Sequence, residues 1–254
     1  MFNRGTNPKC PLCAKPAKSA FLKVDAYTYY RCGNCTAIFV DPVKEQDFYL
    51  GTETYLHHIK QYISHINPYG QRWMIEQFDR LHEKTMQTDQ KGSFFEIGAG
   101  AGFLTLFALA RGWQASGIET SKVAVKFARE SLKVDISLST IERYKVNEKY
   151  DSVAMVEVLE HFLDPYEAVN SIKKFAKSQT FLFGTTPNTD SEHWKKSEQN
   201  IYVPDDHIIL FNEKSIRAFA KKAGVTNLTV EFFGAGEKHD SNLMYAGVIS
   251  GPSE

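Results

Sequence analysis

The stretch Phe94-Phe95-Glu96-Ile97-Gly98-Ala99-Gly100-Ala101-Gly102-Phe103-Leu104 decides the fold of this chain. Apolar residues lead into an acidic residue, three glycines follow at alternate positions, and an apolar run continues to Leu109. This order predicts a buried strand, a tight turn and an amphipathic helix. Glycine has no Cβ, so the backbone of such a turn can approach a ligand closely and offer it the free N–H groups of the helix start. We therefore predict a cofactor-binding turn.

The glycine spacing disfavours a dinucleotide as the cofactor. A dinucleotide fingerprint needs G-x-G-x-x-G, and here the third glycine, Gly102, comes one residue early. Glu96 would repel a pyrophosphate but attract a cationic ligand. A second predicted strand, residues 114–118, ends in Glu119, 21 residues after Gly98, where an acidic residue accepts hydrogen bonds from ribose hydroxyls. A ribose together with a positive charge indicates S-adenosylmethionine (SAM).

With these residues the sequence resembles the class I SAM-dependent methyltransferases, whose first motif is E/D-x-G-x-G-x-G. A predicted strand over 150–156 runs into E-V-L-E-H-F-L-D-P at 157–165, which resembles the subfamily that includes the ubiquinone-biosynthesis O-methyltransferases. T-T-P-N at 185–188 and S-I-R-A-F-A-K-K-A-G at 215–224 match later parts of that subfamily. The resemblance covers roughly residues 92–250.

The resemblance implies an α/β fold, with a Rossmann-like seven-stranded class I methyltransferase sheet and helices on both faces. It also implies that the final strand is reversed. Beyond those already named, we expect strands over 135–139, 180–184, 228–233 and 243–249, and a helix over 122–132. The predicted domains are a zinc-ribbon module (1–42), a helical lid (43–91) and the SAM-binding domain (92–254).

The resemblance also implies the cofactor site. Glu96 is expected near the amine of the methionine moiety, or alternatively as a cap of the turn. Glu119 is expected at the ribose, or alternatively as a solvated carboxylate. The implied cofactor-binding residues are Glu96, Gly98, Ala99, Gly100, Gly102, Glu119, Thr120, Thr140, Ile141, Val156 and Glu157.

Two histidines are the candidate catalytic residues. Methyl transfer from a sulfonium is an in-line displacement that needs alignment of the acceptor, and a base where the acceptor must lose a proton. Glu157 follows the strand over 150–156, at the edge where open α/β sheets bind ligands, and His161 lies four residues further on, where it could share a helical face with Glu157. His207 closes an Asp-Asp-His triplet in a long polar segment, 187–212, of the kind that shapes specificity. Each could instead play a local structural part.

The four cysteines all lie near the start of the chain and predict a structural zinc ion. Two C-x-x-C pairs separated by 18 residues have the spacing of a zinc ribbon, and four thiolates close the coordination shell. The predicted ligands are Cys10, Cys13, Cys32 and Cys35. The alternatives are a pair of disulfides, disfavoured because the chain begins without a secretion signal, and surface thiols, disfavoured because chance would rarely place the only four cysteines in this pattern.

Helical spacing of apolar residues predicts two helices before the core, over 56–66 and 73–81. In the family such helices often cover the cofactor and help to build the substrate pocket. Tyr55, His57, His58 and His65 are therefore further candidates for contact with ligand.

The overall composition favours a small-molecule partner. The 254 residues carry 30 basic and 30 acidic side chains, so net charge gives no drive toward nucleic acid or an anionic membrane. The first 40 residues, however, are locally basic and carry Tyr27, Tyr29 and Tyr30, whose rings could stack on bases. Nucleic acid is therefore disfavoured by the net charge but not excluded. No apolar run approaches a membrane span, and a cytoplasmic protein is expected. The oligomeric state is left open.

The predicted function is transfer of a methyl group from SAM to a small-molecule acceptor, such as a sugar, a lipid or a natural-product intermediate. One alternative is an RNA methyltransferase with the basic ribbon as a tether. Another is a SAM-binding protein without chemistry. A dehydrogenase is the weakest alternative, because of the early third glycine and Glu96.

Overall fold

The structure is a computed structural model that describes residues 8–43, 68–145, 148–196, 201–235, 238 and 240–252. The chain forms two compact units, each built from three segments. The first unit holds residues 1–45, 157–169 and 184–245, and the second holds 46–156, 170–183 and 246–254. The helix expected over 56–66 and the candidates Tyr55, His57, His58 and His65 lie outside the described residues.

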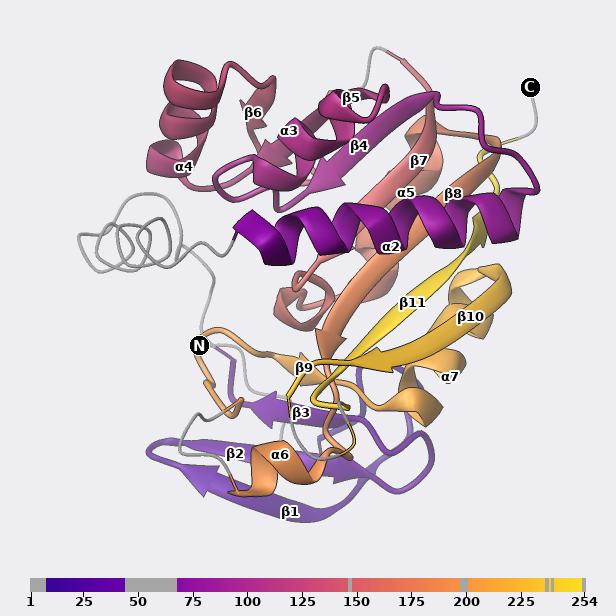
Figure 1. The fold of residues 1–254 in the computed structure, drawn as a ribbon. Coiled ribbons are helices and arrows are strands. Elements are labelled where there is room, and N and C mark those ends of the chain that lie inside the picture. Colours follow the sequence, from indigo (N-terminus) through magenta and orange to yellow (C-terminus); the bar gives the residue numbers. More distant parts are fainter. Residues whose placement is uncertain are drawn as a thin grey trace. The chain divides into compact units, whose positions relative to one another are not determined.

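Seven strands form a mixed sheet in the order β10-β11-β8-β7-β4-β5-β6 (Figure 1). The pairs β4–β5, β4–β7 and β5–β6 are parallel. Strand β11 is antiparallel to its neighbour β8, as their arrows in Figure 1 show, so the expected reversed final strand is present. The predicted Rossmann-like sheet is thus confirmed. Its strands are β4 (Ser93–Ile97), β5 (Gln114–Glu119), β6 (Ile136–Leu138), β7 (Tyr150–Val156), β8 (Ala176–Pro187), β10 (Thr226–Phe233) and β11 (Asn242–Ile249).

Helices alternate with these strands, as parallel connections require. The helices expected after the glycine turn, over 122–132 and over 215–224 are present, and α4 continues into a π-helical turn, Ala128–Leu132. No helix was expected at α5 or α6. The helices are α2 (Pro68–Met86), α3 (Phe103–Ala110), α4 (Lys122–Phe127), α5 (Pro165–Phe175), α6 (Glu192–Lys196) and α7 (Glu213–Ala223). Helix α2 includes the predicted helix over 73–81.

The core of the second unit gathers around Phe78 of α2, which is fully buried. Its ring makes edge-to-face contacts with four aromatic rings of the sheet region, at centroid distances between 5.0 and 5.4 Å. This geometry is the favoured one for aromatic pairs. The four partners are Phe94, Trp113, Phe181 and Phe183.

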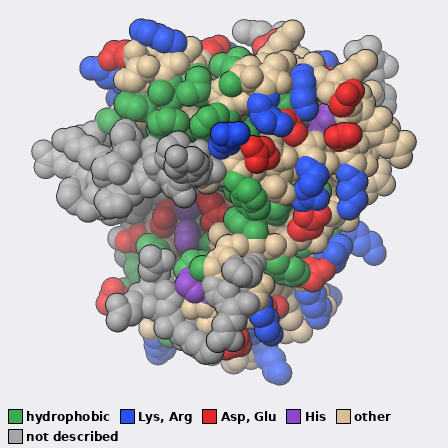
Figure 2. All heavy atoms as spheres, viewed as in Figure 1, with side chains coloured by type: hydrophobic (Ala, Val, Ile, Leu, Met, Phe, Trp, Pro, Cys, Tyr) green, Lys and Arg blue, Asp and Glu red, His purple; other side chains and the backbone are tan. Residues whose placement is uncertain are grey.

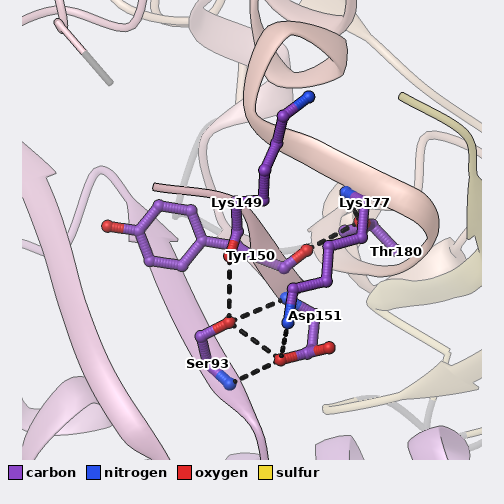
Figure 3. Close-up of polar contacts among 6 residues, drawn as sticks. All are labelled: Ser93, Lys149, Tyr150, Asp151, Lys177 and Thr180. Atoms are coloured by element: carbon purple, nitrogen blue, oxygen red, sulfur yellow. Dashed lines mark hydrogen bonds and ion pairs between the residues drawn. The ribbon is translucent and has the colours of Figure 1, made fainter. Parts of the chain in front are cut away.

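Asp151 ties together the edge of the sheet at which β4 and β7 begin (Figure 3). Its carboxylate accepts hydrogen bonds from the Ser93 N–H and hydroxyl, both at 2.9 Å, and pairs with Lys177 Nζ at 2.8 Å. The Thr180 hydroxyl donates to the Tyr150 carbonyl at 2.8 Å. Although burial alone would raise the pKa of Asp151, Lys177 and Ser93 lower it below its usual value. The glycine turn lies at the opposite, carboxyl end of β4.

The first unit contains a four-stranded sheet in the order β1-β2-β3-β9, from β1 (Ala17–Val24), β2 (Tyr27–Cys32), β3 (Ile38–Asp41) and β9 (Ile209–Leu210). The last strand comes from the polar segment over 187–212, which the sequence patterns did not assign to the ribbon. Helix α7 has good caps: the Asn212 side chain accepts from the Ser215 N–H, and Gly224 ends the helix at φ 78°.

The described helices are too short or too polar to span a bilayer. On the face drawn in Figure 2, Lys and Arg side chains are interspersed with Asp and Glu, in keeping with the formal net charge of zero.

Candidate functional site

The glycine turn joins β4 to α3, and two of its glycines do different work. Gly100 has φ 52°, and a Cβ placed there would meet nothing within 4 Å. Gly102 has φ 82°, and a Cβ there would come within 2.8 Å of the Val134 side chain. Gly100 therefore faces open space, whereas Gly102 permits close packing of α3 on its neighbours.

A pocket that is partly open to solvent lies at this turn, entirely within the second unit. Five predicted cofactor residues line it, together with Gln71 of α2 and residues at the start of α3. The predicted residues in the lining are Glu96, Gly98, Ala99, Gly100 and Val156. Small side chains and exposed backbone make the pocket suited to a ligand that approaches the main chain.

Glu96 lines the pocket but already has partners. One carboxylate oxygen accepts from the Thr105 N–H at 3.0 Å and from its hydroxyl at 2.5 Å, so Glu96 caps the first turn of α3. The side chain is 4% exposed, and burial raises its pKa to about 8 against the effect of these two hydrogen bonds. The capping alternative is thus the contact that the structure contains, and proximity to a bound amine stays a prediction.

Glu119 lies at the end of β5, facing the same turn. Its Oε2 accepts from the Gly100 N–H at 2.9 Å, and its Oε1 accepts from the N–H groups of Thr120 and Ser121, both at 2.8 Å. The carboxylate therefore fixes the glycine turn and the start of α4 at once. Thr140 and Ile141 are not among the residues that line this pocket, and Ile141 is 4% exposed.

The four cysteine sulfurs converge in the first unit. Cys10 and Cys35 Sγ are 3.5 Å apart, Cys13 and Cys32 Sγ are 3.4 Å apart, and all four lie within 4.8 Å of one another. Four sulfurs at about 2.3 Å from a tetrahedral zinc ion lie about 3.8 Å from one another. The cluster therefore has the ligand type, number and spacing of a structural zinc site.

A second cluster in the first unit joins the two candidate histidines. The rings of His161 and His207 are 5.1 Å apart between centroids, and ligand atoms of both lie within 4.8 Å of a Glu160 carboxylate oxygen. His161 Nδ1 lies 2.9 Å from the carbonyl oxygen of Asp206 and 2.9 Å from its Oδ1. His207 Nδ1 lies 2.7 Å from the carbonyl oxygen of Ile201. Both Nδ1 atoms are therefore hydrogen-bond donors, and the Nε2 atom of each ring is the nitrogen left for a further partner.

Glu160 is the exceptional member of this cluster. Its side chain is completely buried, and neither carboxylate oxygen has a hydrogen-bond partner within the described part of the chain. The same holds for the hydroxyl of Tyr245, which is 2% exposed. Burial, with the negative charges of Glu160 and Glu157, raises the pKa of Tyr245 well above its usual value. Buried polar groups of this kind are costly unless a bound molecule, an ion or water completes their hydrogen bonds.

Glu157 directly follows Val156 of the pocket lining in the sequence and begins the chain segment that carries Glu160 and His161. Its φ is 52°, a strained value for a residue with a side chain, and its N–H is held by the Thr185 carbonyl at 3.1 Å. Burial first, and then the charge of Glu160, raises the pKa of Glu157 to about 8. For His161, burial alone would lower the pKa, but Asp206 and Glu160 raise it to about 9.

Three residues of this cluster were missed from sequence. Glu160 could have been found, because Glu157, Glu160 and His161 have the i, i+3, i+4 spacing that brings side chains together on a helical turn. Asp206 was noted only as part of the polar segment. Tyr245 stands in an apolar strand, where nothing distinguishes it from an ordinary core tyrosine.

Comparison with curated proteins supports the same assignment. The ubiquinone biosynthesis O-methyltransferase of Nitrosomonas europaea is 30% identical over 136 residues, covering 51% of this chain and 54% of that protein. The protein of the same name from Proteus mirabilis is 28% identical over 136 residues, covering 51% and 52%. The chain thus spans about half the length of the curated relatives it matches.

Solved structures share the fold. A plantazolicin methyltransferase in complex with SAH has a TM-score of 0.60 at 14% identity, covering 77% of this chain and 90% of that one. A SAM-dependent methyltransferase from Archaeoglobus fulgidus has a TM-score of 0.56 at 14% identity, covering 70% and 94%. The family model described as a methyltransferase domain matches residues 69–230, more than half of the chain. The resemblance expected from the sequence is confirmed, and the chain belongs to the methyltransferase domain family.

Proposed function

We propose that this protein transfers a methyl group from SAM to a hydroxyl oxygen of a small molecule. The observation that carries the acceptor side is the fully buried Glu160, whose oxygens lack partners among the described residues, beside His161 and His207. The names of the curated relatives, which include "O-methyltransferase", favour oxygen as the methylated atom.

The cofactor end of the reaction uses the glycine turn. Gly100 leaves open space at φ 52°, so the backbone can approach the ligand there. Glu119 would receive the ribose hydroxyls with the carboxylate that already fixes the turn. SAM, when bound, supplies an electrophilic methyl group. The protein's part is to hold the acceptor oxygen in line with it, about 3 Å away.

At the acceptor end, the two histidines have different tasks. His161, with its pKa raised to about 9 and Asp206 beside it, is a cation at neutral pH and cannot accept a proton. His207 donates Nδ1–H to the Ile201 carbonyl, so in the neutral ring the lone pair is on Nε2. We assign to His207 Nε2 the proton of the acceptor hydroxyl, and to Glu160 a hydrogen bond from the acceptor.

The same residues fit a divalent cation. Glu160 offers a carboxylate whose oxygens lack partners among the described residues. In place of proton transfer, each imidazole would then offer Nε2 as a ligand, His161 after the ion displaces its Nε2 proton, while its Nδ1–H is held by an oxygen, the usual arrangement of ligating histidines. When bound, such an ion would lower the pKa of the acceptor hydroxyl. For the cysteine cluster we propose a structural zinc ion, held by Cys10, Cys13, Cys32 and Cys35.

The first experiment is calorimetric titration of the purified protein with SAM, with NAD as the control ligand. We expect SAM to bind and NAD not to bind. Transfer is then measured with methyl-labelled SAM against 3,4-dihydroxybenzoate, a nucleotide-sugar panel and bulk RNA, with and without Mg²⁺ and a chelator. Binding of SAM without transfer to any of these would favour a SAM-binding protein without chemistry. Transfer to RNA, with steep loss of binding as salt rises, would favour the tether alternative.

The role of His207 is tested with His207→Gln against His193→Gln. Both histidines lie in the polar segment over 187–212, but His193 contacts Trp194 at 4.8 Å between centroids rather than the cluster. We expect His207→Gln to lower kcat about a hundredfold with SAM affinity unchanged, and His193→Gln to leave kcat within about twofold. Equal rates for the two variants would refute the assignment of His207.

A further inference from the structure

Residues Asp205–Leu210, here called the bridging segment, join two parts of the first unit that the sequence patterns treated as unrelated. One side of this segment contacts the strands of the cysteine-bearing ribbon, and the other contacts the Glu160–His161 turn. All of these residues lie within the same unit. The segment also carries His207, the proposed base.

On the ribbon side, strand β2 presents two tyrosines to the segment. The Tyr27 hydroxyl donates to Asp205 Oδ1 at 2.5 Å, and the hydroxyl of the fully buried Tyr29 donates to the His207 carbonyl at 3.4 Å. Main-chain bonds support them: the Val40 N–H donates to the Ile208 carbonyl at 3.1 Å, and β3 pairs with β9. The ribbon is therefore hydrogen-bonded to the segment on both sides of His207, at Asp205 and at Ile208.

On the acceptor side, the segment holds the Glu160–His161 turn. The Ile208 N–H donates to the Glu160 carbonyl at 2.8 Å. His161 Nδ1 bonds to the carbonyl oxygen of Asp206 and pairs with its carboxylate. A shift of the segment by a fraction of an ångström would consequently move His207 and release His161 together.

The ribbon itself is anchored at its first metal-binding knuckle. The carbonyl of Leu12, between Cys10 and Cys13, accepts hydrogen bonds from the Tyr166 hydroxyl at 2.7 Å and from Lys222 Nζ at 3.2 Å. Lys222 also lies 4.2 Å from the centre of the Tyr166 ring. The knuckle is thereby fixed to α5, which follows the Glu160–His161 turn, and to α7. A platform held in this way can set the position of a segment packed against it.

We propose that Tyr27 and Tyr29 are positioning residues for the acceptor site: through the bridging segment they set the place of His207 and the contact between Asp206 and His161. The proposal rests on the proposed function of His207 and His161. It gives the ribbon a part in catalysis beyond the stability of its own fold. Neither tyrosine touches the reacting atoms, so the effect must appear in turnover and in the order of the segment rather than in SAM binding.

The test compares Tyr27→Phe, Tyr29→Phe and the double variant with Tyr30→Phe. Tyr30 lies on the same strand, and its ring stacks on Phe39, so the control makes the same change without touching the segment. The measurements are zinc content, thermal midpoint, SAM affinity, backbone hydrogen exchange over residues 201–212, and kcat and KM with 3,4-dihydroxybenzoate or whichever probe the wild type methylates. Single variants remove one hydroxyl each, which keeps the test valid if the double variant is poorly folded.

We expect faster exchange over the segment in both single variants. Their kcat should fall about tenfold, with SAM affinity and zinc content unchanged and Tyr30→Phe like the wild type. Unchanged exchange and unchanged kcat would overturn the proposal. Faster exchange with unchanged kcat would also overturn it, because the tyrosines would then be merely structural. A wild type that methylates none of the probes would be a failure of the proposed function instead, and exchange would still show whether the tyrosines hold the segment.

Discussion

Alanine at Gly102 and at Gly100 should fail for different reasons, although the two glycines are two residues apart in one turn. Both have positive φ, which costs a residue with a Cβ about 1–2 kcal/mol. At Gly102 the new Cβ would also meet Val134 at 2.8 Å and Ala128 at 3.1 Å, and such overpacking adds about 1–3 kcal/mol. At Gly100 nothing lies within 4 Å. Gly102→Ala should therefore lower the free energy of unfolding by about 2–5 kcal/mol, and Gly100→Ala by only about 1–2 kcal/mol.

Urea unfolding and SAM calorimetry together separate the two glycines. With a urea slope of about 2 kcal/mol per molar, the extra loss in Gly102→Ala lowers the unfolding midpoint by about 0.5–1.5 M below that of Gly100→Ala. Gly100→Ala should instead lose SAM affinity, because its Cβ occupies the space of the ligand. The reasoning is refuted if the midpoints of the two variants coincide, or if Gly100→Ala binds SAM like the wild type.

Three further predictions concern other buried polar groups. Asp79 pairs with Lys91 at 3.0 Å and with Arg111, and it accepts a hydrogen bond from Trp113 Nε1 at 2.8 Å, so Asp79→Asn should lower the free energy of unfolding in urea by about 2 kcal/mol. Although burial alone would raise the pKa of Asp79, these partners lower it. The stability that Asp79 contributes should therefore be lost only in acid, as the pH falls below about 4. Burial lowers the pKa of His82, so below about pH 6.5 the unfolded chain binds a proton that the folded chain does not, and the free energy of unfolding should fall. His82→Phe keeps the ring contacts with Phe78 and Trp113 and should remove this contribution to the dependence of stability on pH. An unchanged pH dependence in the variant would contradict the assignment to His82. Glu119→Ala should weaken SAM binding at least about tenfold in calorimetry, because it removes both the proposed ribose partner and the acceptor for the Gly100 N–H. Affinity equal to that of the wild type would exclude a role for Glu119.

Much of the fold could be predicted because its signals are local. The strand before Gly98, the glycine turn and the helix after it are encoded in adjacent residues, and the two C-x-x-C pairs specify their own convergence. Pairings between distant segments were not predictable. Strand β9 has two residues, too few for any periodicity, and its partner Ile38 lies far away in sequence.

Within the candidate site, residue types were easier to predict than residue tasks. Glu96 and Glu119 were both expected to serve the cofactor, but each also accepts backbone N–H groups that build the turn. That second use depends on how the helix starts meet the strand ends. Gly102 was expected to contact the cofactor. It has a positive φ, but the Val134 side chain fills the space beside it.

The pairing of β3 with β9 has a consequence for biosynthesis. Phe39 and Ile209 are partners about 170 residues apart, so at about 5–20 residues per second the ribosome finishes β9 roughly 10–30 s after β3. During that interval the outer edge of β3 lacks its final strand, and an unpaired strand edge is a template for wrong association. Even if the four cysteines capture a metal ion early, the bridging segment closes that edge only after it has itself been synthesised. Synthesis of β9 therefore sets the earliest time at which the four-stranded sheet is complete.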